Sequence, residues 1–337
     1  GACAGCPSGT DAATATTGPA DGEGRIRPPR REEALVRLGI RPDRWDVLVA
    51  LAGNPNTGKS TVFNALTGLR QHTGNWPGKT VVRAEGAFLH DDERVKVVDL
   101  PGTYSLQAGS TDEEVARDFL LFGRPDVTVV VVDATRLERN LNLVLQILAI
   151  TDRVVVGLNL MDEARRHGIA VDADRLSREL GVPVVPMVAR EKRGVDELLD
   201  AVLAVARGER TTDPVEIGEL PDRVEEAVAT LTHEVERTFP DLPNARWVAL
   251  RLLNGDGSVA DAVRSGELGA GKEGPSVPGA PEREELLDTA SDLRWTLPPD
   301  FHDALMERTY AEAGRIAGAA QTRGLKRAKF DLDRTLD

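Results

Sequence analysis

The chain has 337 residues, of which 41% are hydrophobic and 29% are charged, and this composition is that of a soluble globular protein with room for two domains. Its 42 basic and 55 acidic residues give a formal net charge of −13, which argues against a general nucleic-acid-binding surface. No run approaches the roughly 18 consecutive apolar residues that indicate a membrane-spanning helix.

The N-terminal segment 1–30 is rich in Gly, Ala, Thr and Pro without apolar periodicity, which predicts a disordered leader. It lacks the charged-then-apolar order of a signal peptide, so we expect the chain to stay on the cytoplasmic side. Cys3 and Cys6 are the only cysteines, and a zinc site needs about four ligands, so a flexible terminus with two thiols is favoured over a metal or redox site. Residues 31–46 are predicted to be a short helical lead-in.

Residues 53–60 read Gly-Asn-Pro-Asn-Thr-Gly-Lys-Ser, the G-x-x-x-x-G-K-S pattern of a phosphate-binding loop. An apolar run of strand length precedes the loop, and a helix that Gly68 ends can follow it. In this context backbone N–H groups and the helix N-terminus surround phosphate oxygens. Lys59 can then reach the β- and γ-phosphates, and the Ser60 hydroxyl can ligate Mg²⁺. The nucleotide-binding residues predicted from this loop are Gly53, Asn54, Pro55, Asn56, Thr57, Gly58, Lys59, Ser60 and Thr61.

Asp99 and Gly102 form a second motif, Asp-Leu-Pro-Gly, after the apolar run 94–98. A carboxylate at the end of such a strand can hold Mg²⁺, and the backbone N–H of Gly102 can face a γ-phosphate.

Residues 71–80 contain two glycines and a proline, so we expect an irregular loop here. Thr80 on this loop can reach the metal when a γ-phosphate is present. Trp76 has two open interpretations: it packs on the domain, or it is exposed when the loop moves.

Asn159 and Asp162 place an amide and a carboxylate at the end of the strand expected at 154–159, where nucleotide crevices form. The Asp162 carboxylate can accept both N–H groups of guanine, at N1 and N2, and adenine lacks this donor pair. The pattern therefore favours a guanine nucleotide. Leu160 stands where this motif usually has a Lys that stacks on the base. The alternative interpretation is that Asp162 caps a helix.

Between residues 47 and 208, short apolar runs alternate with helical stretches, which predicts an α/β fold with a mostly parallel sheet and helices on both faces. Six strands are expected, with one antiparallel edge strand, at 47–52, 81–89, 94–98, 127–132, 154–159 and 184–188. Helices are expected at 58–67, 112–122, 138–150, 172–180 and 194–206. After Gly208 the strand-like runs disappear, so 209–337 is predicted to be a small all-α domain. Its helices are expected at 221–238, 243–253, 283–293 and 299–321, with a flexible Gly- and Pro-rich loop at 254–281.

In order and spacing these motifs match a GTPase, and the chain resembles one family, the ferrous iron transport protein B family. Four segments carry the resemblance: GNPNTGKSTVFNALTG at 53–68, GNWPGKTV at 74–81, DLPGTYSL at 99–106 and VDATRLERNL at 132–141. The second and third segments look specific to this family. The match is strong over about 47–205 and looser over 206–337.

The resemblance implies a Ras-like P-loop GTPase domain over 47–208 and a helical domain, known in the family as guanine-nucleotide dissociation-inhibitor-like, over 209–337. It implies GTP and GDP as ligands, with Mg²⁺ held by Ser60, Thr80 and Asp99. A membrane region that moves Fe²⁺ would follow, so this part would lie at the cytoplasmic face of the cell membrane. No nucleic-acid partner is expected, and the oligomeric state stays open.

The resemblance also implies roles for single residues. Lys59, Thr80, Gly102 and Asn56 would be catalytic. Asn159, Asp162, Val188 and Ala189 would bind the base, the last mainly through its backbone, although Val188 stands where relatives commonly have Ser.

Two features bear on the rate of hydrolysis. Thr103 follows Gly102 in place of the Gln that positions water in Ras-like GTPases, so slow intrinsic hydrolysis is expected. The resemblance implies that Asn56, with backbone oxygens of the 71–80 loop, can hold K⁺ near the β- and γ-phosphates, where the charge of the K⁺ would act like an arginine finger. The other interpretation of Asn56 is a loop-capping amide. Lys79 stands where Val is common in the family.

The leading interpretation is thus a GTP-hydrolysing switch that regulates or drives ferrous iron uptake. A ribosome- or RNA-associated GTPase is the alternative, and the acidic net charge counts against it. An ATP-dependent enzyme, or a nucleotide-binding module without turnover, is a third interpretation. Asn159 and Asp162 disfavour ATP.

Overall fold

The computed structural model describes residues 31–41, 45–68, 71–107, 109–215, 220–240, 242, 244–269 and 278–323. The predictions for the leader 1–30, for Cys3 and Cys6, and for residues after 323 lie outside the described residues. No helix in the described ranges is both long enough and apolar enough to cross a membrane.

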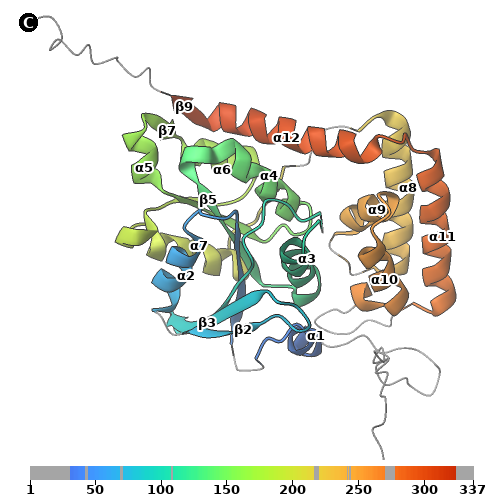
Figure 1. The fold of residues 1–337 in the computed structure, drawn as a ribbon, viewed down its shortest axis with the longest axis horizontal. Helices are drawn as coiled ribbons and strands as arrows, with labels where there is room; N and C mark the ends of the chain where they lie inside the picture. The colour runs from blue at the N-terminus through green and yellow to red at the C-terminus, as the bar shows by residue number, and fades with distance from the viewer. Residues whose placement is uncertain are drawn as a thin grey trace, which may run out of the picture.

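A central sheet organises the first part of the chain (Figure 1), with strand order β2-β3-β4-β1-β5-β6-β8. Strands β4, β1, β5, β6 and β8 are parallel, β3 is antiparallel to β4, and β2 is antiparallel to β3. The strands are β1 (Val47–Gly53), β2 (Gln71–Asn75), β3 (Val82–His90), β4 (Glu93–Asp99), β5 (Val127–Asp133), β6 (Val154–Asn159) and β8 (Val184–Pro186).

The sheet therefore has seven described strands, and the prediction of six was wrong. The difference is β2, in a segment predicted to be a loop, which pairs with β3 from Gln71 opposite Gly86 to Asn75 opposite Val82. An edge strand needs a partner on one side only and tolerates a glycine such as Gly74. Consequently the antiparallel strand β3 lies second from the edge.

Alternating residues of β1 face two different helical layers, as the pleat of a strand requires. Val47, Val49 and Leu51 pack with α2 (Lys59–Thr67) and α7 (Val195–Ala206). Leu48, Ala50 and Ala52 pack on the other side. The elements there are α1 (Arg31–Arg37), α3 (Thr111–Asp118) with its π-turn extension (Phe119–Gly123), α4 (Leu137–Leu148) and α6 (Ala173–Leu180). Because β1, β5 and β6 are buried along their whole length, they read as continuous apolar runs in the sequence.

The second part of the chain is helical, as predicted. Its helices are α8 (Asp222–Thr238), α9 (Ala245–Leu253), α10 (Gly257–Ser265), α11 (Ala280–Thr296) and α12 (Phe301–Ala320). Helix α10 lies inside the loop predicted at 254–281, and that prediction was wrong for this stretch. The Asp256 carboxylate accepts hydrogen bonds from the N–H groups of Ser258 and Val259, which starts the helix. Residues 270–277 lie outside the described residues.

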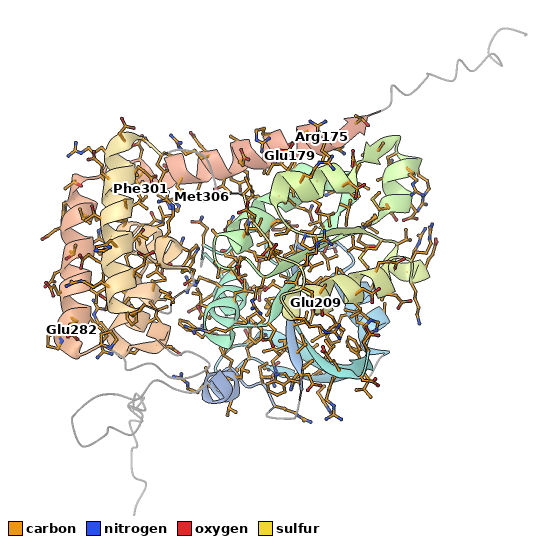
Figure 2. The ribbon with its side chains drawn as sticks, turned by 180° about the vertical axis from the view of Figure 1, so that it is seen from behind. Arg175, Glu179, Glu209, Glu282, Phe301 and Met306 are labelled. Atoms are coloured by element: carbon orange, nitrogen blue, oxygen red, sulfur yellow. The ribbon has the colours of Figure 1, made fainter. Side chains whose placement is uncertain are left out.

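Helix α12 returns from the helical domain across α4 and α6 of the first domain (Figure 1). Its Arg315 pairs with Glu179 of α6 at 2.7 Å, and in Figure 2 Glu179 and Arg175 lie beside this end of α12. The chain then forms β9 (Gln321–Arg323), which pairs antiparallel with β7 (Ile169–Val171). At its other end, His302 of α12 forms a hydrogen bond with Asn254 of the helical domain, so the last helix contacts both domains.

A buried arginine joins α3 to the start of α10. The Arg117 side chain has no exposed surface, and its guanidinium lies 3.2 Å from the carboxylate of Asp256 and 2.5 Å from the hydroxyl of Ser258. Arg251 also bonds Asp256, at 2.9 Å. Burial pushes the pKa of Asp256 upward, but Arg251 and Arg117 outweigh it and hold the pKa below its ordinary value. The two domains therefore meet through charge as well as through apolar packing.

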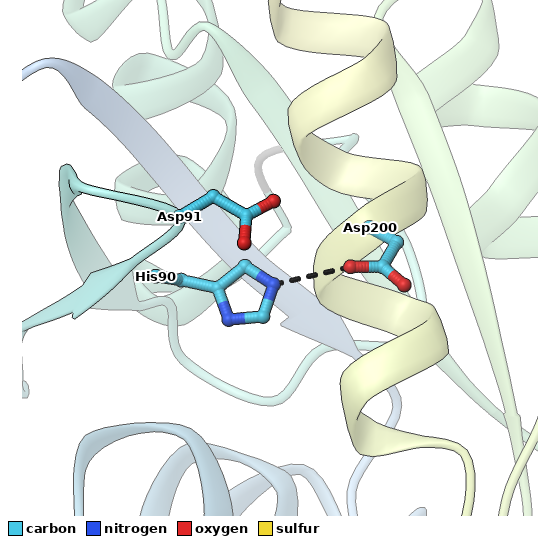
Figure 3. A group of neighbouring side chains, drawn as sticks. All are labelled: His90, Asp91 and Asp200. Atoms are coloured by element: carbon cyan, nitrogen blue, oxygen red, sulfur yellow. Dashed lines mark hydrogen bonds and ion pairs between the residues drawn. The ribbon is translucent and has the colours of Figure 1, made fainter.

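The turn between β3 and β4 is fastened to α7 (Figure 3). Asp91 and Asp92 both have positive φ, which a two-residue hairpin turn requires, and His90 Nε2 lies 3.1 Å from Asp200 Oδ1 of α7. The three side chains of His90, Asp91 and Asp200 bring their donor atoms within 4.8 Å of one another. The bond between His90 and Asp200 joins the turn to α7 at the end of the sheet away from the phosphate loop.

We expect Arg117→Ala to lower the free energy of unfolding by about 3 kcal/mol, because it breaks a buried ion pair that joins the two domains. Arg251 still neutralises Asp256 in this variant. The loss of stability should therefore lie at the lower end of the range that is usual when one partner of a buried ion pair is removed. Chemical denaturation measures it. Arg264→Ala, which removes an exposed pair with Asp261, is the control and should change stability by less than about 0.5 kcal/mol. Equal small losses in both variants would contradict this role of Arg117.

Candidate nucleotide-binding site

The loop between β1 and α2 is shaped by two glycines that no other residue can replace. Gly53 has φ of 154°, and a Cβ on it would lie 2.6 Å from the carbonyl oxygen of Val131. Gly58 has φ of 85°, and a Cβ on it would lie 2.4 Å from the side-chain nitrogen of Asn159. Asn56 between them is also left-handed, with φ of 67°, and its side chain is exposed. The predicted phosphate loop is thus a tight turn packed against β5 and β6.

Lys59 and Asp99, the predicted phosphate-binding cation and Mg²⁺ ligand, contact each other. Lys59 Nζ donates hydrogen bonds to the Asp99 carboxylate and, at 2.7 Å, to the carbonyl oxygen of Leu100. Burial raises the pKa of Asp99 above its ordinary value, and the Lys59 ammonium opposes this shift. Ser60 follows Lys59 and is exposed in the first turn of α2. The Asp99 carboxylate and the Ser60 hydroxyl are oxygen donors of the kind that fits Mg²⁺.

Gly102, predicted to face a γ-phosphate, lies next to the phosphate loop. A Cβ on Gly102 would lie 3.4 Å from backbone atoms of Pro55. The backbone N–H of Leu100 donates to the carbonyl oxygen of Leu51, which continues the pairing of β4 with β1 to this point. Thr103, in the place of a water-positioning Gln, is buried.

Thr80 lies in an exposed bend, and among the described residues it makes no hydrogen bond to the phosphate loop. The bend is closed by the N–H of Trp76, which donates to the carbonyl oxygen of Val81. Trp76 is buried, with its ring centroid 5.6 Å from that of Phe119, so the packed interpretation holds. Lys79 pairs with Glu114 of α3 at 2.6 Å. The structure therefore does not bring Thr80 to Lys59 and Asp99.

Asn159 connects the loops that follow three strands. Its amide donates to the carbonyl oxygen of Thr57 and accepts from the N–H of Ala189, each at 3.0 Å, and the side chain is buried. Ala189 was predicted to contact the base mainly through its backbone, and its N–H donates this hydrogen bond to Asn159. Val188 is buried beside it and pairs with Arg193. Asn159 thus links the phosphate loop to the loop that follows β8.

Asp162 lies in the first turn of α5 (Met161–Arg166), a helix that the sequence did not predict. Leu160, left-handed with φ of 61°, precedes this helix without a side-chain cap bond, so Asp162 is not a helix cap. Its Oδ2 atom contacts Arg190 and accepts a hydrogen bond from Arg166 at 2.8 Å. Partial burial opposes ionisation, but the two guanidinium groups outweigh it and hold the pKa of Asp162 below its ordinary value.

Sequence reasoning missed both arginines at Asp162. Arg166 could have been found, because it follows Asp162 at the i,i+4 spacing of a helical ion pair. Arg190 could not, since it lies in the separate 3-10 turn Ala189–Glu191.

Of the remaining phosphate-loop residues, Asn54 is buried and accepts a hydrogen bond from Thr57, whereas Thr61 is exposed.

A mostly parallel sheet whose first strand ends in this phosphate loop, with Asp99 and Gly102 after the neighbouring strand, defines a Ras-like P-loop GTPase. The family model described as ferrous iron transport protein B matches residues 47–202, and the model of the FeoB cytosolic helical domain matches 221–322. The chain belongs to the ferrous iron transport protein B family. The comparisons give no support to the alternative of a ribosome- or RNA-associated GTPase.

Relatives and solved structures agree with this assignment. The Fe(2+) transporter FeoB of Salmonella typhimurium is 42% identical over 275 residues, which cover 80% of this chain and 35% of the relative. The chain thus spans about a third of that relative's length. A GDP-bound mutant of NFeoB from S. thermophilus has 32% identity and a TM-score of 0.67, covering 82% of this chain and all of that one. The cytosolic domain of L. pneumophila FeoB has 29% identity, the same TM-score and the same coverage.

We expect Asn159→Ala to lower the free energy of unfolding by about 1–3 kcal/mol, since it leaves the buried carbonyl of Thr57 and the buried N–H of Ala189 without partners. Asn159→Asp keeps the acceptor for Ala189, but it replaces the donor to Thr57 with an oxygen and adds a buried ionisable group, so it should destabilise the chain as well. The exposed Asn75→Ala serves as the control and should change stability by less than about 0.5 kcal/mol. Denaturant titration that shows no difference between positions 159 and 75 would contradict the fastening role.

Proposed function

We propose that this chain binds guanine nucleotides and hydrolyses GTP as the cytoplasmic domain of a transporter, where it regulates or drives the uptake of Fe²⁺. The observation that carries the proposal is the meeting of Lys59, Asp99 and Gly102 at a phosphate loop of the required shape. The Asp162 carboxylate selects guanine over adenine. Fe²⁺ is the cargo of the proposed membrane region, and none of the residues discussed at this site is assigned to it.

In this proposal Lys59 leaves Asp99 and turns to the β- and γ-phosphates, which releases the carboxylate as a Mg²⁺ ligand together with Ser60. Bound Mg²⁺ supplies charge neutralisation at the phosphate oxygens. Gly102 lies next to Pro55 of the phosphate loop, and its N–H would face the γ-phosphate. Thr80 has to move to join this group, and a loop that is ordered by GTP and released by GDP is the usual form of such a switch.

We further propose that the intrinsic rate is slow and that K⁺ raises it. Thr103 is short and buried, so it cannot position water as a Gln does. Asn56 presents an exposed amide from a left-handed turn directly in the phosphate loop. Its oxygen fits a monovalent cation that would neutralise charge developing between the β- and γ-phosphates.

The proposed partners follow from the family. The relatives are named as Fe(2+) transporters, and we infer that a membrane region of the same protein receives the signal at the cytoplasmic face. Helix α12, which packs on both domains, is the described element best placed to pass on a change at the nucleotide. Nucleic acid has no part in the proposal.

Turnover in K⁺ and Na⁺ buffers tests the proposal directly. We expect phosphate release from GTP with Mg²⁺ to be faster in K⁺ than in Na⁺ by about tenfold or more, because a cation at the γ-phosphate stabilises the transition state. Asn56→Ala should remove the difference, and Lys59→Ala should abolish turnover in both salts while circular dichroism stays unchanged. Undiminished turnover in the Lys59 variant would place the chemistry elsewhere.

Asp162→Asn tests the base preference. Its amide presents a donor to the N–H groups of guanine, so discrimination in favour of GDP should fall by about 10² or more. Competition calorimetry with GDP, xanthosine diphosphate and ADP measures the change. The neighbouring Glu163→Gln removes a carboxylate from the same helix and should leave the preference as it is. Unaltered GDP affinity in the Asp162 variant would refute this assignment.

A further inference from the structure

The carboxylate that the proposed function assigns to guanine is already held by two arginines. Asp162 Oδ2 contacts Nη2 of Arg190 and accepts from Nη2 of Arg166 at 2.8 Å. A carboxylate oxygen offers two lone pairs, so both acceptor positions of Oδ2 are in use. Oδ1 is buried and has no hydrogen-bond partner among the described residues. Guanine donates from N1 and N2 side by side and needs both oxygens, so one arginine has to leave Oδ2.

Arg166 is the arginine that stays. It lies on the same helix as Asp162 at the i,i+4 position, and its Nε also donates to the backbone carbonyl of Asp162 at 3.4 Å. Its guanidinium therefore moves together with the carboxylate, on the solvent side of α5. Entry of a base does not require this local pair to open.

Arg190 is the arginine that can leave. It reaches Asp162 from a different loop, directly after Ala189, and so bridges the two elements between which the base is expected to lie. Its side chain is 52% exposed, and a second carboxylate, that of Glu191, lies 3.8 Å from its Nε. The guanidinium can therefore leave Asp162, swing outward and keep Glu191 as an acidic neighbour.

We propose that Arg190 gates the base site by competing with guanine for the carboxylate of Asp162. The proposal rests on the proposed function, because it takes Asp162 to be the guanine acceptor. When no base is bound, the ion pair neutralises a partly buried carboxylate and closes α5 onto the 3-10 turn. Binding of the base breaks this pair, which lowers the apparent affinity. An ion pair with one exposed partner changes an equilibrium by up to about fivefold.

Two charge-matched variants test the gate. Arg190→Gln and Arg166→Gln each remove one positive charge that lies beside the Asp162 carboxylate. They therefore change the electrostatic attraction between the protein and the nucleotide phosphates to the same extent. At about 50 mM NaCl we expect R190Q to bind GDP about two- to fivefold more tightly than the wild type in calorimetry. R166Q should not bind more tightly. At about 500 mM NaCl the difference between R190Q and the wild type should shrink, since salt screens an exposed pair.

Turnover separates gating from a change in chemistry. R190Q should lower KM for GTP and leave kcat unchanged, because the pair is broken before the chemical step. The gate would be overturned if R190Q bound GDP no more tightly than the wild type, or if both variants bound it more tightly to the same extent. This conclusion applies if the wild type still prefers GDP over ADP. A wild-type chain without that selectivity would instead overturn the proposed function, and the gate with it.

Discussion

The nucleotide end of the sheet depends on the close approach of Gly58 to the amide of Asn159. A side chain on Gly58 would occupy the position of the Asn159 nitrogen, so the approach is possible only where the loop has no Cβ. The amide uses the space to bind Thr57 on one side and Ala189 on the other. Both polar ends of a buried amide are thereby satisfied, which makes such a contact rigid and specific. The loops after β1, β6 and β8 are consequently held as one unit, and Lys59 starts its helix from that unit.

Features whose chemistry is local could be predicted from the sequence. The strand before the phosphate loop, the helix after it and the strand before Asp99 each depend on neighbours in the chain, and all three lie where expected. The strand β2 does not follow this rule, because Gln71–Asn75 is polar and contains Gly74. It is a strand only because β3 lies beside it. In α10 the signal was present, since Asp256 is a good N-cap and Val259, Ala262 and Val263 have helical spacing, but the surrounding glycines, serines and prolines masked it.

Side-chain pairs between distant loops form a second group that the sequence alone does not predict. The residue types at Lys59 and Asp99 indicated two separate ligands, for phosphate and for Mg²⁺. The structure joins them in one ion pair, so the same two residues have to separate before either can take its proposed role. The contacts of the Asp162 carboxylate are likewise not evident from the sequence, because its two arginines come from two different elements. In both cases a charge with a proposed role in nucleotide binding is balanced by another residue of the protein.

The pairing of β7 with β9 has a consequence for folding. Strand β9 follows the last helix, and β7 lies between α5 and α6, so residues 169 and 323 are neighbours at the two ends of a long closed loop. In the sequence, the helical domain therefore lies between two strands that pair with each other, β7 and β9. It does not simply follow the first domain. Contacts of such sequence separation have a high entropic cost and typically form late. A polypeptide that ends near Gly208 would leave the edge of β7 and the apolar surfaces of α4 and α6 uncovered.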